Sequence, residues 1–280
     1  MLEQDMDTIP IRRSFERDVK GRLKDISGNI EELTTVRYGS HTYPIIAVQY
    51  PNSLRPDHPT VLISGGVHGD EPAGVHSVVD FLRDNVGQYA GYNFVYLPCI
   101  NPSGFEADKR HTMDGKDLNR LFGTGSTQPE IRAIEEYLAR LNTRFHMTLD
   151  LHEDGPTALE EEGVKIEDVP SGCYMYETMV DVRRRIGRAL IDALPPSTEV
   201  CMRSTIYDDV NDYGVIAYPE ANRNPFYAKG TSFDAYLHAH WTDHTLTTET
   251  SMVWPMEKRI AVQCVWLRTA LAHCLSSRVE

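Results

Sequence analysis

Residues 60–71 read TVLISGGVHGDE: an apolar run, a glycine pair, and then a histidine and a glutamate three positions apart. The apolar and β-branched side chains of residues 60–67 predict a buried strand, and the glycine pair predicts a turn at its end. His68 and Glu71 therefore follow the carboxyl end of a strand. Ligands of open α/β sheets bind at that edge, so this stretch indicates both a sheet and a site on it.

A second apolar run ends in a similar way. Residues 145–152 read FHMTLDLH, which places His152 at the end of another predicted strand. Zinc takes imidazole nitrogen and carboxylate oxygen at about 2.0–2.2 Å, and a catalytic site keeps three protein ligands and one open position for water. His68, Glu71 and His152 have that composition, so we expect them to bind one zinc ion.

Further motifs follow in a recognisable order. They are Asn101-Pro102-Ser103-Gly104-Phe105, Arg110, Asp117-Leu118-Asn119-Arg120 and a late Thr248-Glu249-Thr250-Ser251. Together with the three predicted ligands, they resemble the carboxypeptidase A-like family of zinc metallocarboxypeptidases, from roughly residue 60 to the end of the chain. The resemblance implies that His68, Glu71 and His152 bind zinc and that Glu249 is the general base and acid.

The resemblance also implies a place for the carboxylate of a substrate. The counterparts of Arg110, Asn119 and Arg120 lie where that group binds in the family. Guanidinium offers a rigid fork of donors that meets a carboxylate with two hydrogen bonds, and the amide of Asn119 can donate to the same group. We expect Arg110 to stabilise the oxyanion that forms when water attacks, because fixed positive charge at developing charge is often the largest catalytic effect.

Three glutamates compete for the role of base. Zinc lowers the pKa of bound water to about 7, and a carboxylate must then accept the water's proton and return it to the leaving amine. Glu249 lies in the alternating, strand-like stretch of residues 245–250. Glu153 directly follows His152, so in a strand its side chain points to the opposite face. Glu220 lies in turn-like sequence, where a solvated acid is expected.

The family has a tyrosine that closes over the substrate and a pocket that sorts side chains. Tyr227 is the predicted tyrosine, although the alignment needs a one-residue gap and Phe226 is the alternative. Ser232-Phe233-Asp234 resembles the family's specificity pocket, which places Phe233 at the sorting position. An aromatic residue there argues against a deep basic pocket that would select an acidic substrate side chain. Lys229 and Arg223 lie nearby in the sequence, so a preference for an acidic side chain stays open.

One motif departs from the peptidases. Residues 121–123 read Leu-Phe-Gly after the Asn-Arg pair, where typical peptidases have Asn-Phe. This is nearer to the aspartoacylase and succinylglutamate desuccinylase branch, which deacylates small amino acids, whereas Glu249-Thr250-Ser251 is nearer to the peptidases. The expected substrate is a peptide with a free carboxylate, and the alternative is an N-acyl amino acid. An inactive binding module is disfavoured because all three ligands and the base candidate are present.

Composition agrees with an enzyme of the cytoplasm. The chain has 280 residues, a formal net charge of -13 and 5 cysteines without paired spacing, which is typical of reduced thiols. Negative charge disfavours nonspecific binding to nucleic acid. The acidic start, Met1–Asp7, lacks the features of a secretory signal, and no apolar stretch approaches the length of about 20 residues that spans a bilayer. The oligomeric state stays open.

Periodicity along the chain favours a single domain over residues 1–280, in which residues 1–50 form a helix and a strand pair packed on the rest. The expected fold is a three-layer α/β/α sandwich with a mixed, mainly parallel central sheet. The expected elements are a helix from Ile11 to about Leu33, a strand pair in 37–50 turning at Gly39-Ser40, a helix in 73–85, a strand in 92–97, a helix in 129–141, the His152 strand, a loop in 160–169, a strand in 173–176, a helix ending near 194 and a closing helix in 256–276.

A second group of histidines lies at 238, 240 and 244. Its spacing fits no firm metal-ligand template, so a polar loop or helix face is favoured over a second metal site. Glu153 and Asp154 beside His152 raise a similar, weaker hypothesis of a second ion.

Overall fold

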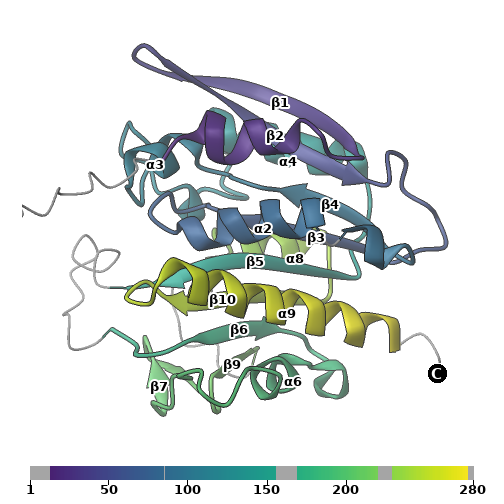
Figure 1. Cartoon of the computed structure of the whole chain (residues 1–280), viewed down its shortest axis with the longest axis vertical. Coiled ribbons are helices and arrows are strands. Elements are labelled where there is room, and N and C mark those ends of the chain that lie inside the picture. Colours follow the sequence, from purple (N-terminus) through teal and green to yellow (C-terminus); the bar gives the residue numbers. More distant parts are fainter. Residues whose placement is uncertain (1–12, 85, 156–168, 220–228, 277–280) are drawn as a thin grey trace, which may run out of the picture.

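The computed structural model describes residues 13–84, 86–155, 169–219 and 229–276, and it is built around an eight-stranded sheet (Figure 1). In spatial order the strands are β1 (Asn29–Tyr38), β2 (His41–Tyr50), β4 (Asn93–Leu97), β3 (Thr60–Gly65), β5 (Met147–Asp154), β10 (Thr245–Ser251), β6 (Tyr174–Thr178) and β9 (Val215–Tyr218). Two short strands, β7 (Thr205–Ile206) and β8 (Asp209–Val210), form a separate hairpin.

The middle of the sheet is parallel, and its outer parts are mixed. β4, β3, β5 and β10 run in the same direction, whereas β2 and β6 are antiparallel to their neighbours β4 and β10. Every residue of β3 and β5 is buried, as expected for parallel strands that are covered on both faces. The carboxyl ends of β3, β5 and β10 consequently meet at one edge.

Helices cover both faces of this sheet, which confirms the predicted three-layer sandwich. α2 (Pro72–Asp84) and α9 (Met256–Ser276) pack together over the central strands on one face. α8 (Phe233–His240) lies against β5 and β10, and α4 (Pro129–Leu141) against β1, behind the sheet in Figure 1. The remaining helical segments are η1 (Glu16–Lys20), α1 (Gly21–Leu23), η2 (Val86–Tyr89), α3 (Pro102–Ala107), η3 (Leu118–Arg120), η5 (Val182–Arg184) and α6 (Gly187–Asp192).

The amino-terminal part corrects one prediction. The helix expected from Ile11 to about Leu33 ends at Leu23, and β1 begins at Asn29. Phe15, Val19 and Leu23 are buried at helical spacing, but the chain then reaches Gly28, where a Cβ atom would lie only 2.8 Å from the carbonyl oxygen of Gln49. Pairing with β2 therefore overrides the local helical periodicity. The predicted turn at Gly39-Ser40 is confirmed, with Gly39 at a φ of 59°.

The other elements lie close to their predicted positions. α4 and α9 have the predicted bounds, while the helix expected to end near residue 194 is the short α6. The predicted loop at 160–169 lies outside the described residues except for its last position. Among the helices that the structure describes, no segment has the length and apolar character needed to cross a membrane.

Candidate metal centre

The loop after β3 is shaped by glycines. Gly66 has a φ of 66°, in the left-handed region that favours glycine. Gly69 approaches α3 so closely that a Cβ atom would lie 2.1 Å from the carbonyl carbon of Gly104. Its backbone N–H donates to the carbonyl oxygen of Arg110 at 3.1 Å. These contacts restrict the backbone conformation of the loop. In that conformation His68 and Glu71 lie over the end of β5.

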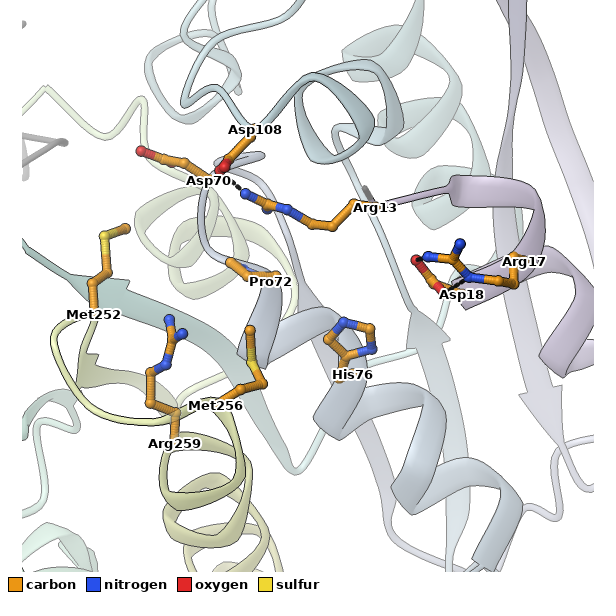
Figure 2. Close-up of a pocket in the computed structure, with 10 residues that line it drawn as sticks. All are labelled: Arg13, Arg17, Asp18, Asp70, Pro72, His76, Asp108, Met252, Met256 and Arg259. Atoms are coloured by element: carbon orange, nitrogen blue, oxygen red, sulfur yellow. Dashed lines mark hydrogen bonds and ion pairs between the residues drawn. The ribbon is translucent and has the colours of Figure 1, made fainter. Parts of the chain in front are cut away.

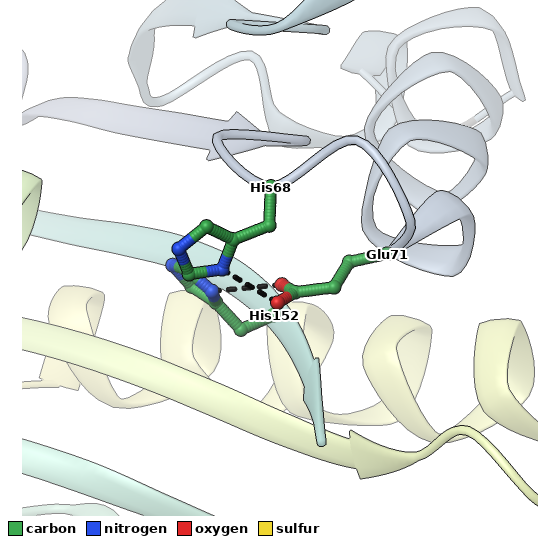
Figure 3. Close-up of side chains that lie close together, drawn as sticks. All are labelled: His68, Glu71 and His152. Carbon is green, nitrogen blue, oxygen red and sulfur yellow. Dashed lines mark hydrogen bonds and ion pairs between the residues drawn. The ribbon is translucent and has the colours of Figure 1, made fainter. Parts of the chain in front are cut away.

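His68, Glu71 and His152 converge in a buried cluster (Figure 3). His68 Nδ1 lies 2.6 Å from Glu71 Oε1, and His152 Nδ1 lies 2.8 Å from Glu71 Oε2. One ligand atom from each residue can be chosen so that all three lie within 4.8 Å of one another. In the part of the chain that the structure describes, this is the one group of three or more His, Cys, Asp or Glu side chains so arranged.

A carboxylate lies behind each imidazole. His152 Nε2 is 2.9 Å from Asp150 Oδ2, and Asp150 Oδ1 accepts a hydrogen bond from Ser64 Oγ at 2.7 Å. His68 Nε2 is 3.5 Å from Asp117 Oδ1. A carboxylate hydrogen-bonded to the remote nitrogen favours the proton there and leaves the Nδ1 lone pair for a metal, which is the usual arrangement around metal-binding histidines. His152 has this hydrogen bond, whereas His68 Nε2 lies near Asp117 without one among the described residues. The donor set of two imidazoles and a carboxylate thus fits zinc.

The charges of the cluster favour a cation at its centre. Burial raises the pKa of Glu71, but the charges of His68 and His152 and their hydrogen bonds outweigh it, so the pKa lies below its ordinary value. Burial lowers the pKa of His152, but Glu71 and Asp150 outweigh it, so that pKa lies well above its ordinary value. Both shifts have the same origin, which is buried negative charge that needs positive charge beside it.

Glu249 lies beside the cluster on the neighbouring strand. It is the register partner of His152 in the parallel pair β5–β10, so the two side chains leave the sheet on the same face. Its Oε2 is buried and has no hydrogen-bond partner among the described residues. Burial raises the pKa of Glu249 well above its ordinary value, although the charge of His152 opposes this.

The other two glutamates lie elsewhere. The side chain of Glu153 points to the opposite face, as the alternation predicts, and accepts hydrogen bonds from Ala73 N and Arg259 Nη1, both at 2.6 Å. Glu220 lies outside the described residues. Of the two described glutamates, Glu249 is the one that lies beside His152 in the cluster.

The predicted substrate-binding residues approach from the loop between α3 and α4. Arg110 is buried, with Nη1 3.2 Å from His68 Nδ1 and Nη2 3.4 Å from Asp117 Oδ2. Asn119 Oδ1 accepts a hydrogen bond from the backbone N–H of Phe233 at 2.8 Å, which fixes the orientation of its amide. Arg120 donates from Nη1 to the carbonyl oxygen of Asn119 at 3.0 Å and remains partly exposed.

The two predicted aromatic residues are placed differently. Phe233 is 0% exposed and packs against Phe122, with ring centroids 4.5 Å apart. In this structure its side chain is part of the core, and its link to the site is the backbone hydrogen bond to Asn119. Tyr227 and its alternative Phe226 lie outside the described residues.

The second histidine group does not gather around a common point. His238 and His240 lie on α8, whereas His244 is buried before β10 with its Nε2 2.8 Å from Glu177 Oε1. Glu153 and Asp154 leave β5 on opposite faces and take different partners: Asp154 accepts hydrogen bonds from Tyr174 at 2.6 Å and from Tyr207 at 2.8 Å. Neither of the two hypothetical second metal sites is assembled among the residues that the structure describes.

Several residues around the cluster were not singled out from the sequence. Tyr174 is the register partner of Glu249 on β6, and Tyr207 lies in the hairpin turn with a φ of 47°. On the other face, Arg259 and Gln263 of α9 hydrogen-bond to β5. Strand register and helix packing place these residues, and no local motif could have identified them.

A pocket of about 440 Å³ lies behind the metal loop, on the side of α2 and α9 (Figure 2). Arg13 spans one side, donating from Nη1 to the carbonyl oxygen of Gly69 at 2.9 Å and pairing with Asp108. Its lining is mixed in charge, consisting of Arg13, Arg17, Asp18, Asp70, Pro72, His76, Asp108, Met252, Met256 and Arg259. None of the three clustered ligands lines it, so it is distinct from the metal cluster.

Comparisons with known proteins agree with this geometry. Residues 57–162 match the succinylglutamate desuccinylase/aspartoacylase catalytic domain. Mouse carboxypeptidase D is 28% identical over 185 residues, which are 57% of this chain and 13% of that protein. The N-alpha-acetyl-L-2,4-diaminobutyric acid deacetylase of Halomonas elongata is 29% identical over 122 residues, which are 43% of this chain and 34% of that protein. The matched part of the chain thus spans 13% and 34% of the length of these two curated relatives.

Solved structures show the same fold. A metallopeptidase-like protein of Shewanella denitrificans superposes with a TM-score of 0.72 and 24% identity, covering 93% of this chain and 89% of that one. Carboxypeptidase structures share the sandwich as well. The chain is therefore similar in fold to metallocarboxypeptidases, and over residues 57–162 it is similar to the succinylglutamate desuccinylase/aspartoacylase catalytic domain.

Proposed function

We propose that this chain is a zinc-dependent hydrolase that removes a carboxyl-terminal residue from a peptide. The observation that carries the proposal is the buried cluster of His68, Glu71 and His152, with a carboxylate behind each imidazole and Glu249 in register beside it. Two imidazoles and one carboxylate are a ligand set of zinc peptidases. His68, Glu71 and His152 would hold one zinc ion.

The metal, when bound, would acidify a water molecule and polarise the scissile carbonyl. Glu249 would accept the proton of that water and return it to the leaving amine. Its buried Oε2, which has no hydrogen-bond partner among the described residues, suits a group that must exchange a proton with substrate rather than serve the fold. Nearby divalent charge favours the ionised carboxylate, which is the form that accepts a proton.

Arg110 and the Asn119–Arg120 pair would recognise charge on the substrate. Arg110 contacts the same buried cluster, so its guanidinium is close enough to stabilise negative charge that develops at the attacked carbonyl. Asn119 and Arg120 would bind the terminal carboxylate. The backbone N–H of Phe233 donates to Asn119 Oδ1. The oxygen of the amide is therefore engaged, and its N–H₂ group is the side that would donate to a substrate carboxylate.

The alternative activity is deacylation of an N-acyl amino acid. It is supported by the match of residues 57–162 to the desuccinylase/aspartoacylase domain and by the similarity to a deacetylase. Both reactions hydrolyse an amide whose amine side carries a carboxylate, so the same metal ligands and base serve either one. They differ in the acyl side, which is a peptide in the first case and a small acid in the second.

Glu249→Gln tests the proposed base. The amide keeps the shape of the side chain but cannot accept a proton, so we expect kcat to fall by about 10²–10⁴-fold while zinc content stays at one ion per chain. Zinc is measured by elemental analysis, and activity is measured as free amino acid released from peptides and, separately, from N-acyl amino acids.

His152→Ala is the matched variant, and it should lose zinc and activity together. An active Glu249→Gln protein with full zinc would remove Glu249 from the mechanism. Activity on N-acyl amino acids alone would favour the deacylase, and a wild-type protein that takes up no zinc would exclude both activities as proposed.

A further inference from the structure

A buried glutamine of α9 contacts both strands that carry the site. Gln263 is 0% exposed. Its Nε2 donates to the carbonyl oxygen of His152 at 2.9 Å, and its Oε1 accepts a hydrogen bond from Thr248 Oγ1 at 2.6 Å. Thr248 directly precedes Glu249 on β10. One side chain thus links the backbone of a proposed metal ligand to the residue next to the proposed base.

One helical turn earlier, Arg259 makes a second link. Residues four positions apart lie on the same face of a helix, and Arg259 Nη1 donates to Glu153 Oε1 at 2.6 Å. The other oxygen of Glu153 accepts from Ala73 N at 2.6 Å, and the backbone N–H of Glu153 donates to Glu71 Oε2 at 3.1 Å. Arg259 therefore reaches the start of α2, next to Glu71, through a single carboxylate.

These polar contacts differ from the other contacts of α9 with the sheet, which are largely apolar. α9 is otherwise packed through apolar side chains such as Trp266, Leu267 and Leu271, all fully buried. Burying a polar amide or an ion pair costs free energy, and a well-packed apolar replacement is often as stable or more so. Stability alone does not account for a buried glutamine and a partly buried ion pair placed directly behind the proposed ligands.

We propose that Arg259 and Gln263 of α9 are positioning residues that hold His152, Glu71 and Glu249 in their working geometry from the far face of the sheet. Gln263 acts on His152 and on Glu249, each through its strand, whereas Arg259 acts on Glu71 and His152 through Glu153. The inference rests on the proposed function. Figure 2 shows Arg259 rising from α9 along the pocket wall towards β5.

Single substitutions separate the two connections. Gln263→Met and Arg259→Met should weaken zinc affinity by about 10–100-fold, the range found when groups behind metal ligands are removed. Thr248→Val breaks the connection to β10 alone, so we expect kcat to fall by about tenfold while zinc affinity stays within about twofold of wild type. Zinc affinity is measured by competition with a chromophoric chelator, and kcat and KM on the best substrate of the wild type.

Two controls keep the result interpretable. Arg268→Met makes the same change at an exposed position of α9 and should leave zinc affinity and kcat unchanged. Arg259→Lys keeps the charge and should recover most of the affinity lost in Arg259→Met. Thermal unfolding of the metal-free proteins reports whether a variant has lost its fold, and Gln263→Glu, which keeps the size and the acceptor, replaces Gln263→Met if that variant does not fold.

The proposal is overturned if folded Gln263 and Arg259 variants bind zinc and turn over substrate as wild type does, or if their metal-free stability falls and nothing else changes. It is also overturned if Thr248→Val lowers zinc affinity as much as Gln263→Met, since the two connections would then not be separate. Failure of the proposed function appears differently, as a wild-type protein that neither binds zinc nor hydrolyses an amide.

Discussion

At the scale of the residue, Asp150 lies behind the proposed metal ligand His152 without belonging to the proposed ligand set. Its two carboxylate oxygens are divided between His152 Nε2 and Ser64 Oγ, so it both holds the imidazole proton and fixes the ring against the sheet. Removing the carboxylate frees the ring to rotate and lets the proton move to Nδ1, the atom that faces Glu71. Ser64 of the neighbouring strand β3 thus supports the carboxylate that orients the proposed ligand His152 on β5.

Asp150→Ala should therefore weaken zinc affinity by about 10–100-fold. Asp150→Asn keeps an acceptor for the imidazole N–H and can still bond to Ser64, so its loss should be smaller than that of the alanine variant. Chelator competition measures both. Equal affinity in Asp150→Ala and wild type would show that His152 is oriented by other contacts.

At the scale of the element, α6 depends on one buried carboxylate. Glu177 on β6 is 1% exposed and accepts hydrogen bonds from the backbone N–H groups of Ile186 and Gly187 at the start of α6, at 2.7 and 2.9 Å. The same carboxylate lies 2.8 Å from His244 Nε2. The carboxylate of Glu177 thereby connects α6, β6 and the segment before β10.

Glu177→Ala leaves those donors without their acceptor, so the free energy of unfolding should fall by about 3–5 kcal/mol. Urea unfolding followed by circular dichroism measures the change. Asp192→Ala, which removes an exposed carboxylate from α6, is the matched control and should cost at most about 1 kcal/mol. A cost below that level for Glu177→Ala would mean that water or neighbouring groups take over the capping.

At the scale of the whole molecule, Glu130 makes stability depend on pH. It is fully buried at the start of α4, where Tyr38 donates to its Oε1 at 2.6 Å and Gln128 to its Oε2 at 2.9 Å. Burial raises the pKa of Glu130, and these hydrogen bonds oppose the rise only in part. A carboxyl with a raised folded pKa adds stability below its unfolded pKa of about 4.3 and loses that contribution as the pH rises through the folded pKa.

The side chain in Glu130→Gln cannot ionise, so this variant does not lose stability as the pH rises through the folded pKa of Glu130. Relative to wild type, its free energy of unfolding should therefore increase as the pH rises above the unfolded pKa of about 4.3 and level off above the raised folded pKa, by about 1.4 kcal/mol for each pKa unit between the two states. Urea unfolding at several pH values measures the trend. Glu136→Gln, on the exposed side of the same helix, should follow the wild-type profile, and parallel profiles for Glu130→Gln and wild type would contradict the prediction.

The same scales separate what the sequence could predict from what it could not. His68, Glu71 and His152 each end an apolar run or follow its turn, so local pattern was sufficient to place them, and the alternation of strands and helices was sufficient for the sandwich. Gln263 and Arg259 carry no such signal, because a polar residue in a helix looks exposed until the packing of that helix is known. The predicted amino-terminal helix is too long, because the pairing of β1 with β2 is a tertiary effect that the local sequence pattern does not carry.

β10 pairs with β5 although it lies far later in the chain, so the site is completed late during translation. All three proposed ligands precede residue 153, whereas Glu249 and α9 follow about 100 residues later, a delay of roughly 5–20 s at ordinary rates of synthesis. The nascent chain thus carries its proposed metal ligands before it carries its proposed base, and the helix that braces both comes last. A chain that stops short of β10 would still present the three ligands, but it would lack both the proposed base and the brace behind them.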